Sequence, residues 1–129
     1  MTLDSSALIA ILFSEPGYLE LVDAILEADV VRVGAPTLVE TAMVLAGRRG
    51  SAVGGELDGL VRELGVTIVP FGEAERHRAL DAMNRYGRGR HAAALNFGDC
   101  LAYATAAVAG DTLLFVGRDF LKTDIRPAV

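Results

Sequence analysis

The sequence has one cysteine, two histidines and no tryptophan in 129 residues. The lone Cys100 cannot close a disulfide within the chain, which excludes a secreted scaffold held by bridges and is typical of a reducing cytoplasm. No cysteine pair accompanies His77 and His91, so the ligand spacing of a zinc site is missing as well.

Long hydrophobic runs are also missing. The apolar run nearest the N-terminus covers only residues 7–13, whereas a membrane-spanning helix needs about 20 apolar residues. The segment before this run contains Asp4 and no Lys or Arg, which does not fit a signal peptide. The sequence therefore predicts a soluble, cytoplasmic protein without a membrane segment.

The length and composition favour one domain, covering residues 1–129, with a core of its own. Hydrophobic residues make up 52% of the chain and 14 glycines come in addition, above the usual apolar share of about 45–50% with glycine included. This composition excludes disorder and predicts that a second copy or a partner covers part of the surface. A candidate for that surface is an apolar stripe at helical spacing, formed by Val53, Leu57, Leu60 and Leu64.

Short apolar runs alternate with segments of helical periodicity along the chain. The apolar runs predict strands at residues 2–3, 30–34, 66–69 and 113–116. Periodicity, together with the glycines and prolines that interrupt it, predicts helices at residues 6–13, 18–28, 35–46, 53–64, 74–86 and 101–109. This alternation predicts an α/β fold with a central parallel sheet of about four to five strands and helices on both faces.

Charge is spread unevenly around the net value of −5. The first 31 residues contain six acidic side chains and no Lys or Arg, whereas five arginines face the single acid Asp81 between residues 76 and 91. The basic stretch is either a solvated helix face or a phosphate-binding surface. Its candidate phosphate contacts lie in and beside a predicted glycine-containing loop, and they are Arg85, Arg88 and Arg90.

Four acidic residues are predicted to meet at the carboxyl end of the sheet, where open α/β sheets bind ligands. Asp4 follows the first strand, and Glu40 lies in the first turn of the helix after the second strand. Asp99 begins the buried helix, and Asp119 follows the fourth strand by three residues. Four carboxylates would form an oxygen-rich site of the kind that binds Mg²⁺ or Mn²⁺.

Three of these acids also have a simpler interpretation as helix caps. Asp4 can cap the first helix, because aspartate is a preferred N-cap residue. The segments 37–40 and 96–99 have the spacing of capping boxes, in which Glu40 and Asp99 would satisfy backbone N–H groups. Capping is the stronger explanation for any single acid, whereas the set of four favours a metal site.

In order and spacing, five segments resemble PIN-domain nucleases, and in particular the VapC-type ribonuclease toxins of bacterial toxin–antitoxin pairs. The segments are DSSAL (4–8), APTLVE (35–40), NFGDCLAYA (96–104), LLFVGRDF (113–120) and TDI (123–125). The resemblance implies a single PIN-like domain and a Mg²⁺- or Mn²⁺-dependent endoribonuclease. It further implies an acidic site with an accessory hydroxyl near the metal, formed by Asp4, Glu40, Asp99, Asp119 and Ser6.

The resemblance also implies an RNA substrate, a cognate antitoxin, and a homodimer or a toxin–antitoxin hetero-oligomer. Arg85, Arg88 and Arg90 would then bind RNA phosphates. The sequence departs from the family at Arg118, where Asn or another acid is common, so Asp124 is an alternative fourth acid. Two other functions stay open: a PIN-type RNA-processing nuclease without an antitoxin, and a non-catalytic α/β module that binds a partner.

Overall fold

A computed structural model describes residues 1–50 and 54–129 of the chain. Its elements in chain order are β1 (Thr2–Leu3), α1 (Ser5–Leu12), α2 (Tyr18–Glu27), β2 (Arg32–Gly34), α3 (Ala35–Arg49), α4 (Gly54–Glu63), β3 (Thr67–Val69), α5 (Glu73–Tyr86), α6 (Phe97–Ala109), β4 (Leu113–Leu114) and the short 3₁₀ helix η1 (Phe120–Lys122). None of the helices in these two ranges combines the length and the apolar character that crossing a membrane requires.

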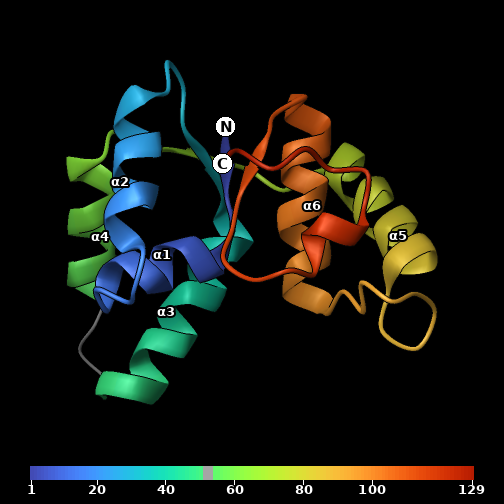
Figure 1. Cartoon of the computed structure of the whole chain (residues 1–129), viewed down its shortest axis with the longest axis horizontal. Helices are drawn as coiled ribbons and strands as arrows, with labels where there is room; N and C mark the ends of the chain where they lie inside the picture. Colours follow the sequence, from blue (N-terminus) through green and yellow to red (C-terminus); the bar gives the residue numbers. More distant parts are fainter. Residues whose placement is uncertain (51–53) are drawn as a thin grey trace.

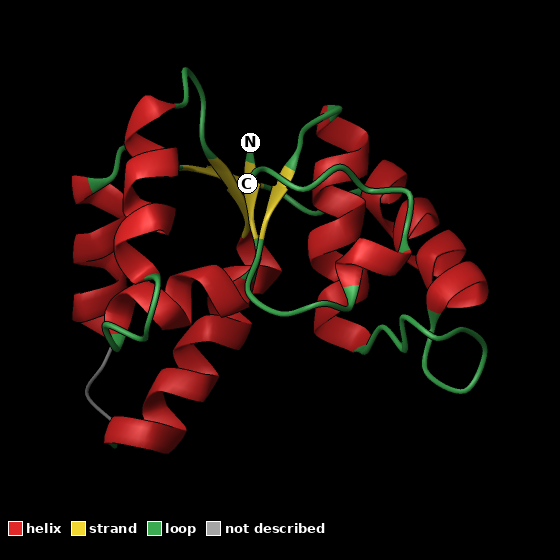
Figure 2. Ribbon diagram, in the orientation of Figure 1, coloured by secondary structure: helices red, strands yellow, loops and turns green. Residues whose placement is uncertain are grey.

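The strands form one parallel sheet with the order β3-β2-β1-β4. Thr2 of β1 is in register with Arg32 on one side and with Leu113 on the other. Helices α1 to α4 lie on one side of the sheet, and α5 and α6 lie on the other (Figures 1 and 2). The predicted α/β fold, with a parallel sheet covered on both faces, is confirmed.

Two apolar cores hold the helices against the sheet. The first joins strand residues such as Leu3 and Val33 to the helices α1 to α4, and the second packs α5 and α6 around Leu113. Leu57 is buried in the first core, and Leu60 and Leu64 pack against it. Leu57 therefore stabilises the domain itself, and the prediction that it is part of a partner surface is wrong; Leu60 and Leu64 contribute to the core but stay half-buried. Val53, the fourth residue of that stripe, lies outside the described residues.

Some of the large apolar side chains are not part of either core and are exposed elsewhere on the surface. Val39 and Met43 lie on the outer face of α3, and Phe97, at the start of α6, is 80% exposed. Val39 is the neighbour of Glu40 in the chain, and Phe97 is the neighbour of Gly98, whose Cα faces the Glu40 carboxylate. Exposed apolar side chains thus border the edge of the sheet that carries the predicted site.

Two helix boundaries differ from the predictions in ways that affect the site. Helix α3 continues through Gly47 and ends at Gly50, which has φ +91°, a conformation that favours glycine. A glycine inside an exposed helix costs only about 1 kcal/mol relative to alanine, so Gly47 does not stop the helix. Helix α6 begins at Phe97 rather than at residue 101, which puts Asp99 inside its first turn.

Candidate active site

Asp4 joins the end of β1 to the start of α1. Its backbone N–H donates to the Leu114 carbonyl at 2.9 Å, which continues the pairing of β1 with β4. Its Oδ2 caps α1 by accepting from the Ser6 N–H at 3.0 Å and from the Ser6 hydroxyl at 2.5 Å. The predicted cap is confirmed, and the Asp4 residue is only 3% exposed.

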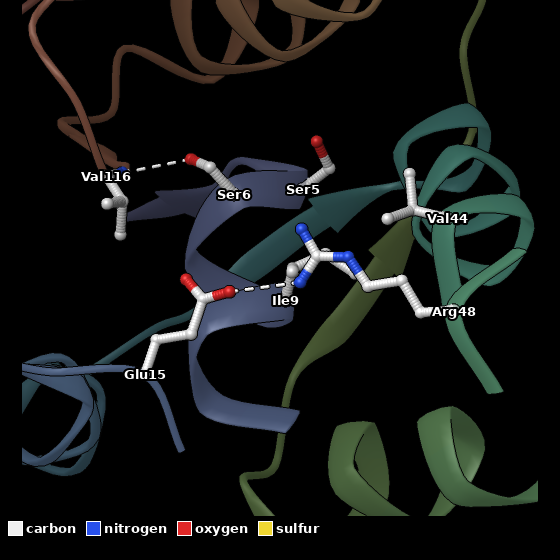
Figure 3. Close-up of a pocket in the computed structure, with 7 residues that line it drawn as sticks. All are labelled: Ser5, Ser6, Ile9, Glu15, Val44, Arg48 and Val116. Atoms are coloured by element: carbon white, nitrogen blue, oxygen red, sulfur yellow. Dashed lines mark hydrogen bonds and ion pairs between the residues drawn. The ribbon is translucent and has the colours of Figure 1, made fainter. Parts of the chain in front are cut away.

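The Ser6 hydroxyl connects Asp4 to the chain that follows β4. Its Oγ donates to Asp4 and accepts from the Val116 N–H at 2.9 Å (Figure 3). The segment that leads to Asp119 is therefore tied to the N-terminus of α1 through one hydroxyl. The structure puts Ser6 in direct contact with Asp4, where the sequence predicted an accessory hydroxyl.

Glu40 is not part of a capping box, and that interpretation of residues 37–40 is wrong. Helix α3 has Gly34 as its N-cap, so Thr37 is already inside the helix and buried. Glu40 instead accepts a hydrogen bond from the Ser5 hydroxyl at 3.0 Å. A Cβ atom at Gly98 would collide with the Glu40 carboxylate, so glycine there leaves room for this side chain. Sequence reasoning missed Ser5 and Gly98, whose only signal is their position beside Asp4 and Asp99.

Asp99 lies in the first turn of α6 and forms the predicted capping box with Asn96. The Asn96 N–H donates to Asp99 Oδ2 at 2.9 Å, and the Asp99 N–H donates to Asn96 Oδ1 at 2.9 Å. Burial and, to a smaller extent, the negative charges of Asp4 and Asp119 together raise the pKa of Asp99 to about 6, against the opposing effects of the Asn96 N–H and Arg88. Asp99 is thus a helix cap and, at the same time, a member of a group of acids.

Asp4 and Glu40 are affected by burial and by neighbouring acids in the same way. Burial is the main cause that raises the pKa of Asp4, and the charge of Glu40 adds to it. Burial also raises the pKa of Glu40, and the charge of Asp99 adds to that shift. Because parallel strands bring their carboxyl ends to one edge, each of the four acids lies within electrostatic range of at least one other: Asp4 of Glu40, Glu40 of Asp99, and Asp99 of Asp4 and Asp119.

Two carboxylate oxygens in this acid group have no partner. Among the described residues, Asp4 Oδ1 and Glu40 Oε2 are buried and receive no hydrogen bond. Buried carboxylates without compensation are costly, and a divalent cation that prefers oxygen ligands would supply the missing charge. In the described ranges, no three Asp, Glu, His or Cys side chains stand close enough to hold one ion together. Metal binding therefore requires some of these carboxylates to rotate toward one another.

Asp119 and Asp124 have different surroundings. Asp119 is exposed at the start of η1, makes no side-chain cap there, and acts on the pKa of Asp99. Asp124 accepts from the Tyr103 hydroxyl at 2.8 Å and from Arg85 Nη2 at 3.0 Å. Burial and the bond to Asp124 raise the pKa of Tyr103 to about 12. Asp119 therefore belongs to the acid group, while Asp124 ties the C-terminal segment to α5 and α6.

The three arginines of the predicted phosphate surface also differ. Arg85 is engaged by Asp81 and Asp124 and lies over the ring of Tyr86 at 4.7 Å. Arg88 and Arg90 are exposed in the loop after α5, where the sequence predicted one. Arg88 is close enough to Asp99 to lower its pKa, so of these three arginines it is the one within electrostatic range of Asp99.

The fold and the acid group at this edge of the sheet match those expected of a PIN-domain nuclease, and comparisons with known proteins point to the same family. The family model described as PIN domain matches residues 1–126. Ribonuclease VapC30 of Mycobacterium tuberculosis is 41% identical over 126 residues, which cover 97% of this chain and 95% of that protein. Ribonuclease VapC of Mycolicibacterium smegmatis is 41% identical over 125 residues, 97% of each chain. The chain therefore belongs to the PIN-domain family, within its group of VapC ribonucleases.

A solved structure supports the same fold. The toxin VapC20 of Mycobacterium tuberculosis, described as cleaving the sarcin-ricin loop, superposes with a TM-score of 0.74 over 98% of each chain. The sequences are 17% identical, so this likeness concerns the fold alone.

Proposed function

We propose that this chain is an endoribonuclease that cleaves RNA phosphodiester bonds with Mg²⁺ or Mn²⁺, and that it acts as a toxin restrained by a cognate antitoxin. The observation that carries the proposal is the group of four acids with two buried, unpartnered oxygens. Relatives named as VapC ribonucleases, at 41% identity over nearly the whole chain, support the choice of RNA as substrate.

Asp4 and Asp99 would be the direct metal ligands, with Glu40 and Asp119 completing the site. A divalent ion held by these residues would supply a lowered pKa for a water molecule and positive charge beside the scissile phosphate. The Ser5 and Ser6 hydroxyls hold one oxygen each of Glu40 and Asp4, which leaves the second oxygen free to face the reaction. Oε2 of Glu40 receives no hydrogen bond, so Glu40 would also be placed to orient the attacking water and accept its proton.

The caps alone do not account for this arrangement. Capping uses one oxygen of Asp4 and one of Asp99, and it leaves the position of Glu40 unexplained. A module that only binds a partner would gain nothing from burying repelling carboxylates, because the repulsion destabilises the folded protein. Buried acidic side chains that repel one another are typical of functional sites.

The direct test is cleavage of a randomised RNA library by the parent protein with Mg²⁺, with Mn²⁺ and with EDTA. Glu40→Gln keeps an oxygen that can accept from Ser5, and it should lower the cleavage rate by at least about 100-fold. Glu27→Gln, at the exposed end of α2, is the matched control and should cleave like the parent. Cleavage that persists in EDTA, or that survives Glu40→Gln, would contradict the proposal.

We further propose that a homodimer, or a hetero-oligomer with the antitoxin, covers the exposed apolar surface formed by Val39, Met43 and Phe97. Cleavage of cellular RNA also implies that the protein works in the cytoplasm. Size-exclusion chromatography with light scattering should give a dimer for the parent and a monomer for Met43→Glu. An RNA-processing nuclease without an antitoxin would instead cleave RNA equally with and without the product of the adjacent upstream gene.

A further inference from the structure

Beside the acid group, the surface is hollowed between α1, α3 and the chain after β4 (Figure 3). This hollow, named here the α1–α3 hollow, has a volume of about 250 Å³. That volume is just below the range of about 300–1,000 Å³ that is usual for sites of drug-sized ligands. It suits one small ring system and is too small for a helix or a hairpin. Its lining residues are Ser5, Ser6, Ile9, Glu15, Val44, Arg48 and Val116.

One end of the hollow is formed by the hydroxyls that hold the acids. Ser5 bonds to Glu40, and Ser6 bonds to Asp4, so a group bound in the hollow lies one side chain away from the proposed reaction centre. The walls between the two ends are apolar and come from Ile9, Val44 and Val116. Apolar walls next to the reacting phosphate are suited to the flat faces of an aromatic ring.

The opposite end of the hollow carries a charge pair. Arg48 reaches across from α3, and its Nη1 donates to Glu15 Oε1 at 3.0 Å (Figure 3). Both side chains stay partly exposed, so a ligand can reach them. A guanidinium has five N–H donors, and a carboxylate has two acceptor oxygens, so donors and an acceptor remain for a ligand.

We propose that the α1–α3 hollow binds the base of the nucleotide next to the scissile phosphate, and that it contributes to the choice of cleavage site. This inference rests on the proposed function. A base is flat and uncharged, and its edge carries hydrogen-bond donors and acceptors, which match Arg48 and Glu15. The faces of the base would pack on the apolar walls.

Other ligands match the hollow less well. Arg48 and Glu15 form a pair without net charge, so neither a phosphate nor an ammonium or guanidinium group gains a net electrostatic attraction there. A purely apolar peptide side chain would remove water from the charge pair without offering it a hydrogen bond, which is unfavourable. A neutral group with a polar edge avoids this penalty, so a base is favoured over a peptide from a protein partner.

The test couples a change in the hollow to a change in the RNA. Val44→Trp fills the hollow from a wall residue that is 37% exposed, and Val108→Trp makes the same change at a 40% exposed position on α6. The parent and both variants are assayed with an RNA oligonucleotide that the parent cleaves. They are also assayed with a series of oligonucleotides, each of which lacks the base of one nucleotide beside the cleavage site. Loss of one particular base should lower kcat/KM of the parent by about tenfold or more.

Val44→Trp should lower kcat/KM for the intact RNA by a similar factor and should no longer respond to loss of that base. Val108→Trp should behave like the parent. If the parent and Val44→Trp respond equally to the loss of every base, the hollow binds no base, while the nuclease assignment stands. If Val44→Trp impairs only binding of the antitoxin, the hollow belongs to a protein interface and the inference is overturned.

A second measurement does not depend on cleavage. The four nucleoside 5′-monophosphates are titrated in EDTA while the methyl signals of Ile9 and Val44 are followed by NMR. Saturable shifts of the Ile9 signal that Val44→Trp abolishes would support the hollow as a base site even if no RNA is cleaved. Absence of any such shift, together with unchanged responses to base removal, would overturn the inference.

Discussion

Replacing Asp99 by asparagine separates the role of this residue as a helix cap from its role in the acid group. An asparagine oxygen can still accept from the Asn96 N–H, so the capping box survives the change. The negative charge next to Asp4 and Asp119 is removed. If the burial of this charge and its repulsion by the other acids destabilise the metal-free protein, Asp99→Asn should be more stable than the parent in EDTA.

The size and the pH dependence of this effect follow from the pKa of Asp99. The rise from 3.8 to about 6 corresponds to about 3 kcal/mol at 1.36 kcal/mol per unit. Screening by solvent reduces this to on the order of 1–2 kcal/mol, because the side chain is only half-buried. The folded parent binds more protons than the unfolded chain between pH 3.8 and about 6, so its stability falls as the pH rises through that window. The gain in Asp99→Asn should be fully present above pH 7 and absent near pH 4.

The assay is a set of thermal melts in EDTA across this pH range. At pH 7.5, Asp99→Asn should melt roughly 4–8 °C above the parent. Asp23→Asn removes an equal charge from the exposed face of α2, and its stability should stay within about 0.5 kcal/mol of the parent at every pH. Mn²⁺ should stabilise the parent by about 2.7 kcal/mol at a hundred times its Kd, and Asp99→Asn much less. Equal stabilities of the parent and Asp99→Asn at pH 7.5, with equal Mn²⁺ shifts, would refute the reasoning and leave Asp99 as a cap only.

Three further predictions concern neighbours of the acid group. Arg88→Ala should weaken RNA binding similarly across sequences. It should also reduce the slope of log binding constant against log salt concentration by about 0.7, measured by fluorescence anisotropy; an unchanged slope would mean that Arg88 is a solvated surface residue without a phosphate contact. Gly98→Ala should leave the melting temperature nearly unchanged and lower the cleavage rate about 100-fold, because the added methyl displaces Glu40. Tyr103→Phe removes the donor to Asp124 and should lower the free energy of unfolding by about 1 kcal/mol in urea titrations; no change would mean that the bond is not formed in solution.

Most of the fold could be predicted from the sequence because its signals are local. Apolar runs and helical periodicity identify every strand and every α-helix of the described residues, with boundaries that differ by a few residues, but they miss the short η1. The errors arise where contacts between distant elements decide which face of a helix is buried. The helical spacing of Leu57, Leu60 and Leu64 shows that these residues share one face, but it does not distinguish a face on the core from a face on a partner. Only the neighbouring elements settle which one it is.

The acid group could be predicted because topology brings strand ends together, whereas its supporting contacts could not. The bond from Ser5 to Glu40 joins α1 to α3, and the free space at Gly98 depends on how α6 packs against α3. Arg85 has the same local sequence signal as Arg88, yet Asp124, 39 residues away, engages it. Contacts between distant segments decide which charged residues remain available for a ligand.

Capping and metal binding are compatible roles for the same side chains, and in this fold one role favours the other. A helix that starts directly after a parallel strand puts its N-cap at the carboxyl edge of the sheet, which is where Asp4 lies. Each cap engages one carboxylate oxygen, as Ser6 does with Asp4 Oδ2 and the Asn96 N–H does with Asp99 Oδ2. The second oxygen of Asp4 is left buried and without a partner. The caps thus fix the side chains that a cation would need, and a substitution that preserves the cap while removing the charge is the change that distinguishes the two roles.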